Sequence, residues 1–506
     1  MEIQFGTETE IGITREKPEG IDVVAESIAL VRSTTAPGVR MRWDYSCEDP
    51  HCDARGFHVK ELLQDIDESN YFAQDAQRTL SFNEIKSDLV LRNGARFYND
   101  HAHPEYCTPE CSTLLEILQQ DFSGDALMAA CARNLSQKSD NPVYLYKNNS
   151  DFLGHSYGCH ENYLMPRKLP WDTLSQALVA FLVTRQIMCG AGKYGWEEED
   201  RYVRPGFQLS QRSDFFSELQ SVDTMQRRPI INTRDEPHAN NELYRRFHVI
   251  IGDSNLSLYS TYLKIGTTSV VLQALLNGAP LERVPQLAEP LRTLKHISRD
   301  TSFKWYCRDS QGTKTTAVDV QRAYLKLVRE FCPDLSADWA QLVDCWEHVL
   351  DDLDRDPLST ANRLDWAAKF KLIDGFRKEE NLKHDDPWLQ SLDLSYHLLD
   401  HENGLFYGLM DQGALETPYP FEAINSHCLC PPSSTRAAVR GRCIERFGST
   451  VQATQWDYIL VQGKEKKIEL DLRNLFDPNL VRQSLQIINR AKSVEDLLEL
   501  KFAKLV

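Results

Sequence analysis

Polar side chains at alternate positions of predicted strands are the feature that most constrains the fold of this chain. Glu8 and Glu10 lie two residues apart, directly after a predicted strand at residues 2–6. His248 lies between two apolar residues of another predicted strand, so it faces away from the apolar side. Because side chains at i and i+2 of a strand point to one face of its sheet, such strands have one polar face and one apolar face. The pattern predicts an α+β fold, with helices packed on the apolar face.

Apolar residues at helical spacing and turn signals predict the remaining elements. Asn93-Gly94 is a hairpin signal between two of the strands. Pro333 is expected to end one helix, and Ser359-Thr360 to cap another. The predicted helices are 21–32, 171–189, 257–277 and most of 318–376, and the predicted strands are 89–91, 96–98, 143–146, 156–165 and 247–251.

The chain is long enough for more than one domain. We expect a large catalytic domain at residues 1–428 and a small C-terminal α+β domain at residues 429–506, after a linker-like segment around Cys430. Residues 41–86 are polar, charged and weakly periodic. Long loops in compact domains are usually functional or disordered, so we expect this segment to be a mobile loop that regulates the site.

Charge and motif content exclude several classes of protein. The net charge is −17 and Lys- or Arg-rich runs are absent, so a nucleic-acid partner is not expected. The sequence has no phosphate loop, dinucleotide-binding fingerprint or GxSxG motif. No apolar stretch is long enough to span a bilayer and the N-terminus does not resemble a signal peptide, which predicts a soluble, cytoplasmic protein. Most of the 13 cysteines are interpreted as buried free thiols.

Two acidic clusters are candidates for metal binding or acid–base chemistry. Glu8 and Glu10 would repel on one face of a strand, and a divalent cation would remove that repulsion. The alternative interpretation is a solvated edge strand. The second cluster, Tyr98 to Tyr106, contains an aspartate, a glutamate and two histidines within six positions. Surface decoration does not explain such density, which favours a metal or acid–base role.

Two further clusters carry histidine and arginine. His160 and Asn162 share one face of a predicted strand, although a single strand histidine is often a satisfied core residue. Arg234 lies in a polar loop after an apolar run. Its planar guanidinium suits phosphate or carboxylate, while a structural ion pair is the alternative.

Together these motifs resemble the Pup ligase and depupylase family. The resemblance implies a glutamine-synthetase-like fold, related to carboxylate–amine ligases: a large domain with an antiparallel sheet backed by helices, plus the small C-terminal domain. It extends from the start of the chain to the stretch WDYILV, nearly its whole length. The motifs that carry it are GTETEIG, NGARFYNDHAHPEY, YKNN, SYGCHENYLM, INTRDEPHA, RRFHVIIGDSN and PPSSTRAAVRG.

The family has a ligase branch and a depupylase branch, and this chain resembles the second more. The segment MRWDYSCEDPHCDARGF is similar to an insert of depupylases, and DHAHPEY and PGFQLSQRSD are also depupylase-like. TETE, Cys159 and CGAGK are more similar to ligases. The resemblance implies an ATP-dependent hydrolase. It would cleave the isopeptide bond between the C-terminal glutamate of Pup and a substrate lysine, and deamidate a C-terminal glutamine of Pup. The first alternative is a Pup–protein ligase acting through a γ-glutamyl phosphate. A small-molecule amidoligase and a non-catalytic Pup or nucleotide binder are the others.

The resemblance also implies roles for individual residues. Asp100 would lie at the reaction centre, either attacking the amide itself or acting as base while a phosphate retained from ATP attacks. Two of the metal ligands that the resemblance implies are histidines, His160 and His248. Histidine ligands are less typical of magnesium and would suit manganese or zinc better. The expected partners are Pup or a Pup-like modifier and pupylated proteins, with the proteasomal ATPase as a further candidate. Magnesium would be bound by Glu8, Glu10, Glu105, His160 and His248, and ATP by Arg234, Arg436 and Trp456.

Overall fold

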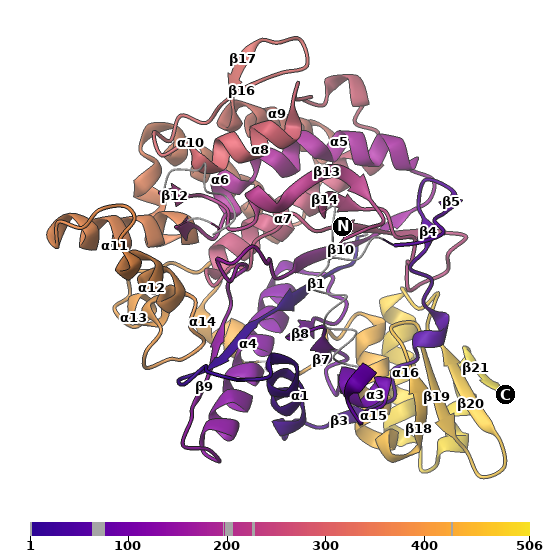
Figure 1. Cartoon of the computed structure of the whole chain (residues 1–506). Helices are drawn as coiled ribbons and strands as arrows, with labels where there is room; N and C mark the ends of the chain where they lie inside the picture. The colour runs from indigo at the N-terminus through magenta and orange to yellow at the C-terminus, as the bar shows by residue number, and fades with distance from the viewer. Residues whose placement is uncertain (1–2, 63–75, 196, 198–205, 225–227, 427–428) are drawn as a thin grey trace.

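A nine-stranded sheet is the centre of the fold (Figure 1). The structure is a computed structural model that describes residues 3–62, 76–195, 197, 206–224, 228–426 and 429–506. The strand β1 (Phe5–Glu10) is the central one, so Glu8 and Glu10 lie in the middle of the sheet. In spatial order the strands are β13 (Phe216–Ser221), β14 (Arg228–Asn232), β15 (Tyr244–Val249), β10 (Cys159–Pro166), β1, β8 (His103–Cys107), β7 (Arg96–Asp100), β6 (Leu89–Leu91) and β3 (Gly38–Arg40).

The two faces of the sheet differ, as the alternation of side chains predicted. Phe5, Thr7 and Thr9 are buried on one face of β1, while the residues between them are only partly buried. The strand β10 repeats this alternation along its length. Neighbouring strands pair antiparallel except β13 and β14, which run parallel. The expected antiparallel sheet is therefore a mixed sheet with one parallel pair at its edge.

Helices cover the apolar face of the sheet and form the main core with it (Figure 1). Phe5, Tyr163 and Phe247 from three adjacent strands belong to the same buried cluster as Leu178 and Leu263 from two helices. Burying one such side chain contributes about 1.5–3 kcal/mol, so this face stabilises the fold and leaves the other free for polar groups. The helices of this layer are α4 (Leu114–Ser136), α5 (Trp171–Thr184), α6 (Gln186–Cys189), α7 (Leu258–Leu276), α8 (Pro290–Arg299), α9 (Ala317–Phe331) and α10 (Ala337–Arg355).

Smaller elements surround this core. The antiparallel pair β2 (Gly12–Arg15) and β9 (Val143–Tyr146) packs with α1 (Val23–Ser33) in a second apolar cluster. Among the described residues, no helix combines the length and the hydropathy needed to cross a bilayer. The other elements are α11 (Asp365–Glu379), α12 (Pro387–Tyr396), α13 (Leu405–Asp411), α14 (Phe421–Asn425), β11 (Lys193–Tyr194), β12 (Phe207–Gln208), β16 (Tyr306–Arg308), β17 (Lys314–Thr316) and the 3₁₀ turns η2 (Ser213–Phe215), η3 (Leu281–Arg283) and η4 (Pro357–Asn362).

The segment 41–86 contains more structure than the sequence predicted. The ring of Trp43 is 5% exposed and lies between the guanidinium of Arg96, 4.1 Å from its centroid, and the ring of Trp456, 5.3 Å away. Aromatic side chains fix the first part of the segment, so the predicted loop contains short regular elements. Residues 63–75 lie outside the described residues, and the mobility of the segment stays a prediction. Its elements are η1 (Tyr45–Cys47), β4 (Cys52–Asp53), β5 (Phe57–His58) and α3 (Phe82–Lys86).

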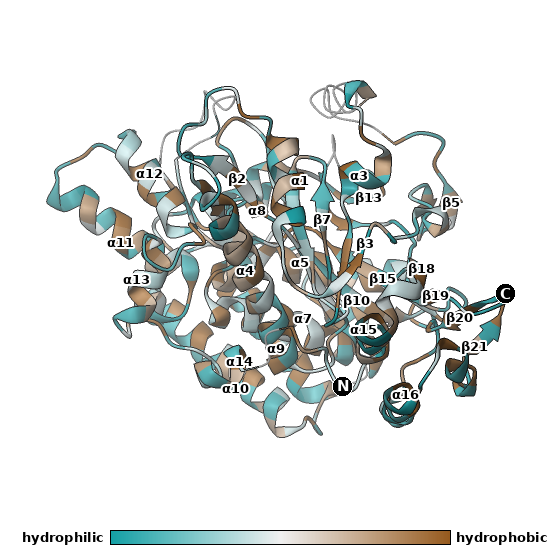
Figure 2. Cartoon of the chain, turned by 90° about the horizontal axis from the view of Figure 1, so that it is seen from below, coloured by the Kyte–Doolittle hydropathy of each residue, from teal (hydrophilic) through white to brown (hydrophobic). Residues whose placement is uncertain are grey.

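The C-terminal region forms a small sheet with helices on it, as expected. It lies to one side of the large sheet, with the C-terminus at its outer edge (Figures 1 and 2). Its core is a separate apolar cluster. The predicted boundary falls at residue 428, which lies outside the described residues, so the boundary stays a prediction. The elements are α15 (Arg436–Phe447), η5 (Gly448–Thr450), β18 (Val451–Thr454), β19 (Tyr458–Gln462), β20 (Lys467–Asp471), α16 (Pro478–Arg490), η6 (Val494–Glu499) and β21 (Ala503–Leu505).

The helix α15 fastens this region to the large sheet. Arg436 and Arg440 each form an ion pair of 2.6 Å with Glu110, which follows β8. Burial opposes ionisation of Glu110, but the two arginine charges lower its pKa to about 2. Gly441 meets the turn between β6 and β7, where an added Cβ would lie 2.0 Å from the carbonyl oxygen of Arg92. The close approach therefore requires glycine at position 441.

Most of the predicted elements are present, with shifted ends. The hairpin at Asn93-Gly94 is confirmed, and Gly94 has the positive φ of 82° that the turn requires. The first strand begins at Phe5 and runs through Glu10, further along the chain than predicted. Ser359-Thr360 do not cap a helix, because they lie inside η4, and α11 begins at Asp365 after Leu364.

Candidate active site

Strand register aligns chemistry-bearing residues in a row across the polar face of the sheet. Glu8 on β1 pairs with Cys107 on β8 and with His160 on β10. Cys107 in turn pairs with Arg96 on β7. Paired residues of antiparallel strands have Cβ atoms about 4.5–5.5 Å apart, so their side chains meet on the same face. Four strands thus place a carboxylate, a thiol, an imidazole and a guanidinium in one row across the polar face of the sheet.

The first candidate metal cluster is Glu8, His160 and His248. His160 Nδ1 lies 3.2 Å from Glu8 Oε2, and His248 Nε2 lies 3.8 Å from the same oxygen. Burial opposes ionisation of Glu8, yet the hydrogen bond with His160 and the electrostatic interactions with His248 and Arg246 hold its pKa well below the usual value. Burial lowers the pKa of His248 well below its usual value, and the Arg246 charge adds to this. A carboxylate beside a neutral imidazole is a set of donors suited to a divalent cation.

The second candidate metal cluster is Glu10, Glu105 and Asp100. Glu10 pairs with Glu105 across β1 and β8, and one ligand oxygen from each of the three residues lies within 4.8 Å of the others. Glu105 is buried, and burial together with the charges of Asp100, Glu8 and Glu10 raises its pKa well above the usual value. A cation among these oxygens would remove the repulsion.

Asp100 ends β7 at the edge of the second cluster. Lys86 Nζ lies 2.6 Å from Asp100 Oδ1, and His101 Nδ1 lies 4.0 Å from the same oxygen. Burial opposes ionisation of Asp100, but the positive charges of Lys86 and His101 lower its pKa below the usual value. Asp100 is therefore ionised through protein cations, unlike Glu105.

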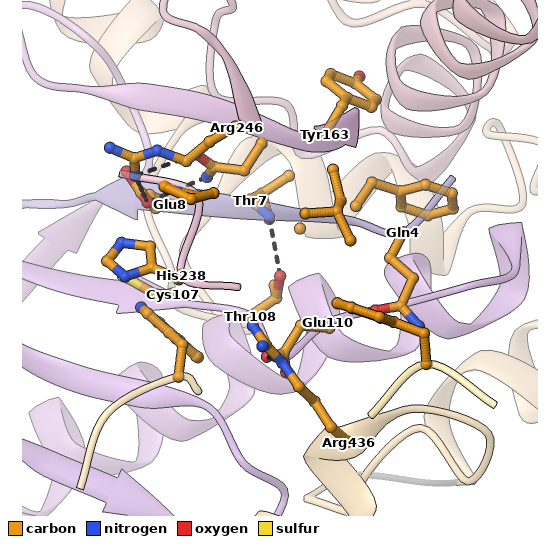
Figure 3. A pocket seen from close by; sticks show the side chains of 17 residues that line it. Gln4, Thr7, Glu8, Cys107, Thr108, Glu110, Tyr163, His238, Arg246 and Arg436 are labelled. Carbon is orange, nitrogen blue, oxygen red and sulfur yellow. Dashed lines mark hydrogen bonds and ion pairs between the residues drawn. The ribbon is translucent and has the colours of Figure 1, made fainter. Parts of the chain in front are cut away.

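A pocket begins at Glu8 and extends towards the C-terminal domain. Trp456 and Arg436 line its far end, and His238 lies between Arg246 and Arg436. Figure 3 shows Glu8 and Arg246 on one side of the pocket and Arg436 with Glu110 on another. The pocket thus joins a flat aromatic surface to the first candidate metal cluster.

Arg234 lies beside the first cluster rather than in the pocket lining. It follows the end of β14, and its backbone N–H donates to the Asn232 side chain. Its guanidinium lies 3.9 Å from Glu236 Oε2, which Arg246 approaches to 3.6 Å. The Arg234 charge contributes to the lowered pKa of His248. Arg234 therefore places a guanidinium next to the first candidate metal cluster, outside the pocket lining.

The model of a family described as Pup-ligase protein matches residues 4–460. The chain belongs to the Pup ligase family. It is 40% identical over 475 residues to a Mycobacterium tuberculosis (strain H37Rv) protein named Pup deamidase/depupylase, and the alignment covers 90% of each chain. The resemblance noted in the sequence is confirmed, including its preference for the depupylase branch.

Two solved structures of the family's ligase PafA share this fold. The crystal structure of the complex between the prokaryotic ubiquitin-like protein Pup and PafA has a TM-score of 0.77 and 29% identity, covering 98% of this chain and 94% of that one. The structure of PafA in complex with ADP has a TM-score of 0.71 and 32% identity, covering 86% and 97%. The α+β architecture of the Pup ligase family is therefore confirmed for this chain.

The site of this family member includes residues that the sequence reasoning missed. Arg246 lies 3.7 Å from Glu8 Oε1 and lines the pocket. The sequence already indicates that Arg246 faces the site, because it precedes His248 by two positions on β15 and so shares its face. Cys107 shared the face of Glu105 for the same reason. Lys86 had no such signal, because only the tertiary fold brings α3 to the end of β7.

Unpartnered polar atoms test whether a cation and a phosphate chain fit this site. Neither ring nitrogen of His248 has a hydrogen-bond partner among the described residues, and the same holds for Nε of Arg234 and Nε of Arg246. Buried polar atoms normally find partners, so these need explanation. A divalent cation at the imidazole and anionic oxygens at the two guanidiniums would provide the missing partners. The donor set therefore fits both groups.

Proposed function

We propose that this chain is a nucleotide-requiring hydrolase of Pup amide bonds. It would cleave the isopeptide bond between the C-terminal glutamate side chain of Pup and a substrate lysine, and convert a C-terminal glutamine of Pup to glutamate. The observation that carries the proposal is the likeness to a protein named Pup deamidase/depupylase along 90% of both chains. Pup and pupylated proteins are accordingly its proposed partners. The proteasomal ATPase and a cytoplasmic location stay predictions.

The pocket is the proposed nucleotide site. An adenine ring would lie against Trp456, with Arg436 beside the ribose and phosphates, and the phosphates would extend towards Glu8 and Arg234. The pocket joins Trp456 and Arg436 to Glu8, and a family member has been solved with ADP. The guanidiniums of Arg436 and Arg234 would neutralise phosphate charge, which arginine does through paired N–H donors.

The two candidate metal clusters are the proposed magnesium sites. Glu8, His160 and His248 would hold one ion, and Glu10 and Glu105 the other. Bound magnesium would screen the phosphates and hold them in register with the reaction centre. The histidines would also accept manganese or zinc.

Asp100 is the proposed reactive group. It is ionised at neutral pH, lies at the end of the second cluster and is partly exposed. Amide hydrolysis needs a nucleophile or a base that activates one, and an ionised carboxylate can act as either. As nucleophile Asp100 would contact the scissile amide, and as base it would contact the group that attacks the amide.

Product analysis separates this function from the ligase alternative. The purified chain would be incubated with ATP, magnesium and a Pup conjugate bearing a fluorescent lysine amide. A hydrolase releases free Pup and the labelled lysine, with far fewer ATP molecules consumed than bonds cleaved. A ligase instead joins Pup ending in glutamate to a lysine and consumes one ATP for each bond formed. Stoichiometric conjugation without cleavage would contradict the proposal.

Glu8→Ala and Glu10→Ala are each expected to weaken nucleotide binding in the presence of magnesium. Each change removes one proposed ligand, and loss of a ligand or of its support typically costs about 10–100-fold in metal affinity. The measurement is a calorimetric titration of ATP analogue at fixed magnesium, repeated without metal.

Glu465→Ala is the matched control, because Glu465 is exposed in the hairpin turn of the C-terminal domain. Its nucleotide affinity should equal that of the wild type. An unchanged affinity in both Glu8→Ala and Glu10→Ala would return the pair to a structural role on the sheet.

A further inference from the structure

The segment 41–86 ends at the candidate reaction centre. Its last helix, α3, contacts β7 and presents Lys86 to Asp100, with 2.6 Å between Nζ and Oδ1. The Lys86 side chain is 17% exposed and that of Asp100 24% exposed, so the ion pair is largely shielded from water. A shielded pair of this length is stronger and more directional than an exposed one. The segment therefore places a cation against the carboxylate of Asp100.

The position of Lys86 is fixed from both of its ends. A capping box between Ser81 and Glu84 begins α3. The ring of Phe82 packs on Tyr45 from the start of the same segment, with 4.9 Å between centroids. The Ile85 carbonyl accepts from the Asn99 side chain on β7, at 3.2 Å. The helix that carries Lys86 is therefore attached to the strand that carries Asp100.

A second set of contacts holds the residues after Lys86. Asp88 Oδ1 accepts from Arg96 Nε at 2.8 Å, and its Oδ2 accepts from the Tyr45 hydroxyl at 2.8 Å. Arg96 also donates to the Tyr45 hydroxyl, at 2.6 Å. Tyr45, near the start of the segment 41–86, is thus tied to Asp88, two residues after Lys86. Displacement of either end would move the ammonium away from Asp100.

We propose that Lys86 is a positioning residue for the amide hydrolysis: it holds one oxygen of Asp100 and directs the other to the scissile bond. This inference rests on the proposed function. Asp100 is the carboxylate of its cluster that an ammonium of the protein contacts, whereas Glu10 and Glu105 face each other across the strands. The contact with Lys86 therefore distinguishes Asp100, the proposed reactive carboxylate, from Glu10 and Glu105, the two proposed metal ligands beside it. Without the ammonium, Asp100 would be free to turn towards a bound cation and away from the substrate.

The test compares Lys86→Met and Lys86→Gln with the wild type in cleavage of a Pup–fluorophore conjugate. We expect kcat to fall by about 10–100-fold in both, as for a misplaced reacting group. KM for the conjugate and the Kd for ATP analogue should stay within about twofold, because Lys86 touches Asp100 rather than the pocket. Lys86→Arg keeps the positive charge and should recover most of the loss.

Lys378→Met is the matched control, because it breaks a lysine–aspartate pair of 2.8 Å on α11 that is remote from the site. Its kcat should equal that of the wild type, and thermal unfolding will show that each variant is folded. A wild-type kcat in either folded neutral variant would overturn the inference. A rise of KM by the factor expected for the fall in kcat, with kcat itself unchanged, would also overturn it. Inactive wild-type protein would instead contradict the proposed function, so the two failures are distinguishable.

Discussion

Asp100→Asn is expected to lower the rate of Pup amide cleavage by about 10²–10⁴-fold, which is the contribution of a positioned acid, base or nucleophile. The change is nearly isosteric, so the end of β7 should keep its shape. It removes the negative charge that Lys86 pairs with and the basicity that either catalytic role requires. ATP binding should stay close to that of the wild type, because the nucleotide pocket does not include Asp100.

Single-turnover cleavage of a fluorescent Pup conjugate, with a parallel nucleotide titration, measures both quantities. Asp334→Asn is the control, because Asp334 is exposed in the turn between α9 and α10. A folded Asp100→Asn protein that cleaves at the wild-type rate would make Asp100 structural. A protein that loses nucleotide binding as well would place Asp100 among the metal ligands instead.

Arg185→Met is expected to lower the free energy of unfolding by about 3–5 kcal/mol, the cost of leaving one partner of a buried ion pair alone. Glu161 lies on β10 and points to the face opposite His160, where it is fully buried. Both of its oxygens bind the guanidinium of Arg185, which also donates to Thr268 at 2.6 Å. The substitution would leave the Glu161 carboxylate in the apolar layer beneath the active site.

Urea unfolding of three proteins tests this expectation. Arg283→Met breaks an exposed pair with Glu330 and should leave the free energy of unfolding close to that of the wild type. A double variant, Glu161→Met with Arg185→Met, should lose less stability than Arg185→Met alone, because no buried charge remains. Equal losses in Arg185→Met and Arg283→Met would show that the buried pair does not support the sheet.

Alternation along single strands made much of the site predictable from sequence. Glu8 with Glu10 and His160 with Asn162 share a face because i and i+2 always do, and the register of the sheet then brings those faces together. The grouping of Glu8 with His160 and His248, but of Glu10 with Glu105, depends on which strands are neighbours. The order of the strands in the sheet cannot be read from a single sequence.

Long-range packing explains what the sequence did not predict. Trp43 lies in the predicted mobile loop, whose sequence is weakly periodic, and its partners Arg96 and Trp456 come from distant elements. Lys86 reaches Asp100 for a similar reason. The parallel pairing of β13 with β14 also depends on the path of the chain between them rather than on composition.

Nucleotide dependence of Pup conjugate cleavage is the most direct test of the account. The purified chain would be freed of nucleotide, divided, and assayed with a fluorescent Pup conjugate in the presence of ATP and magnesium or of a metal chelator alone. The account predicts release of the labelled lysine in the first sample and none in the second, because the candidate metal clusters and the pocket serve the same reaction. Full cleavage by the nucleotide-free, metal-chelated protein would contradict it.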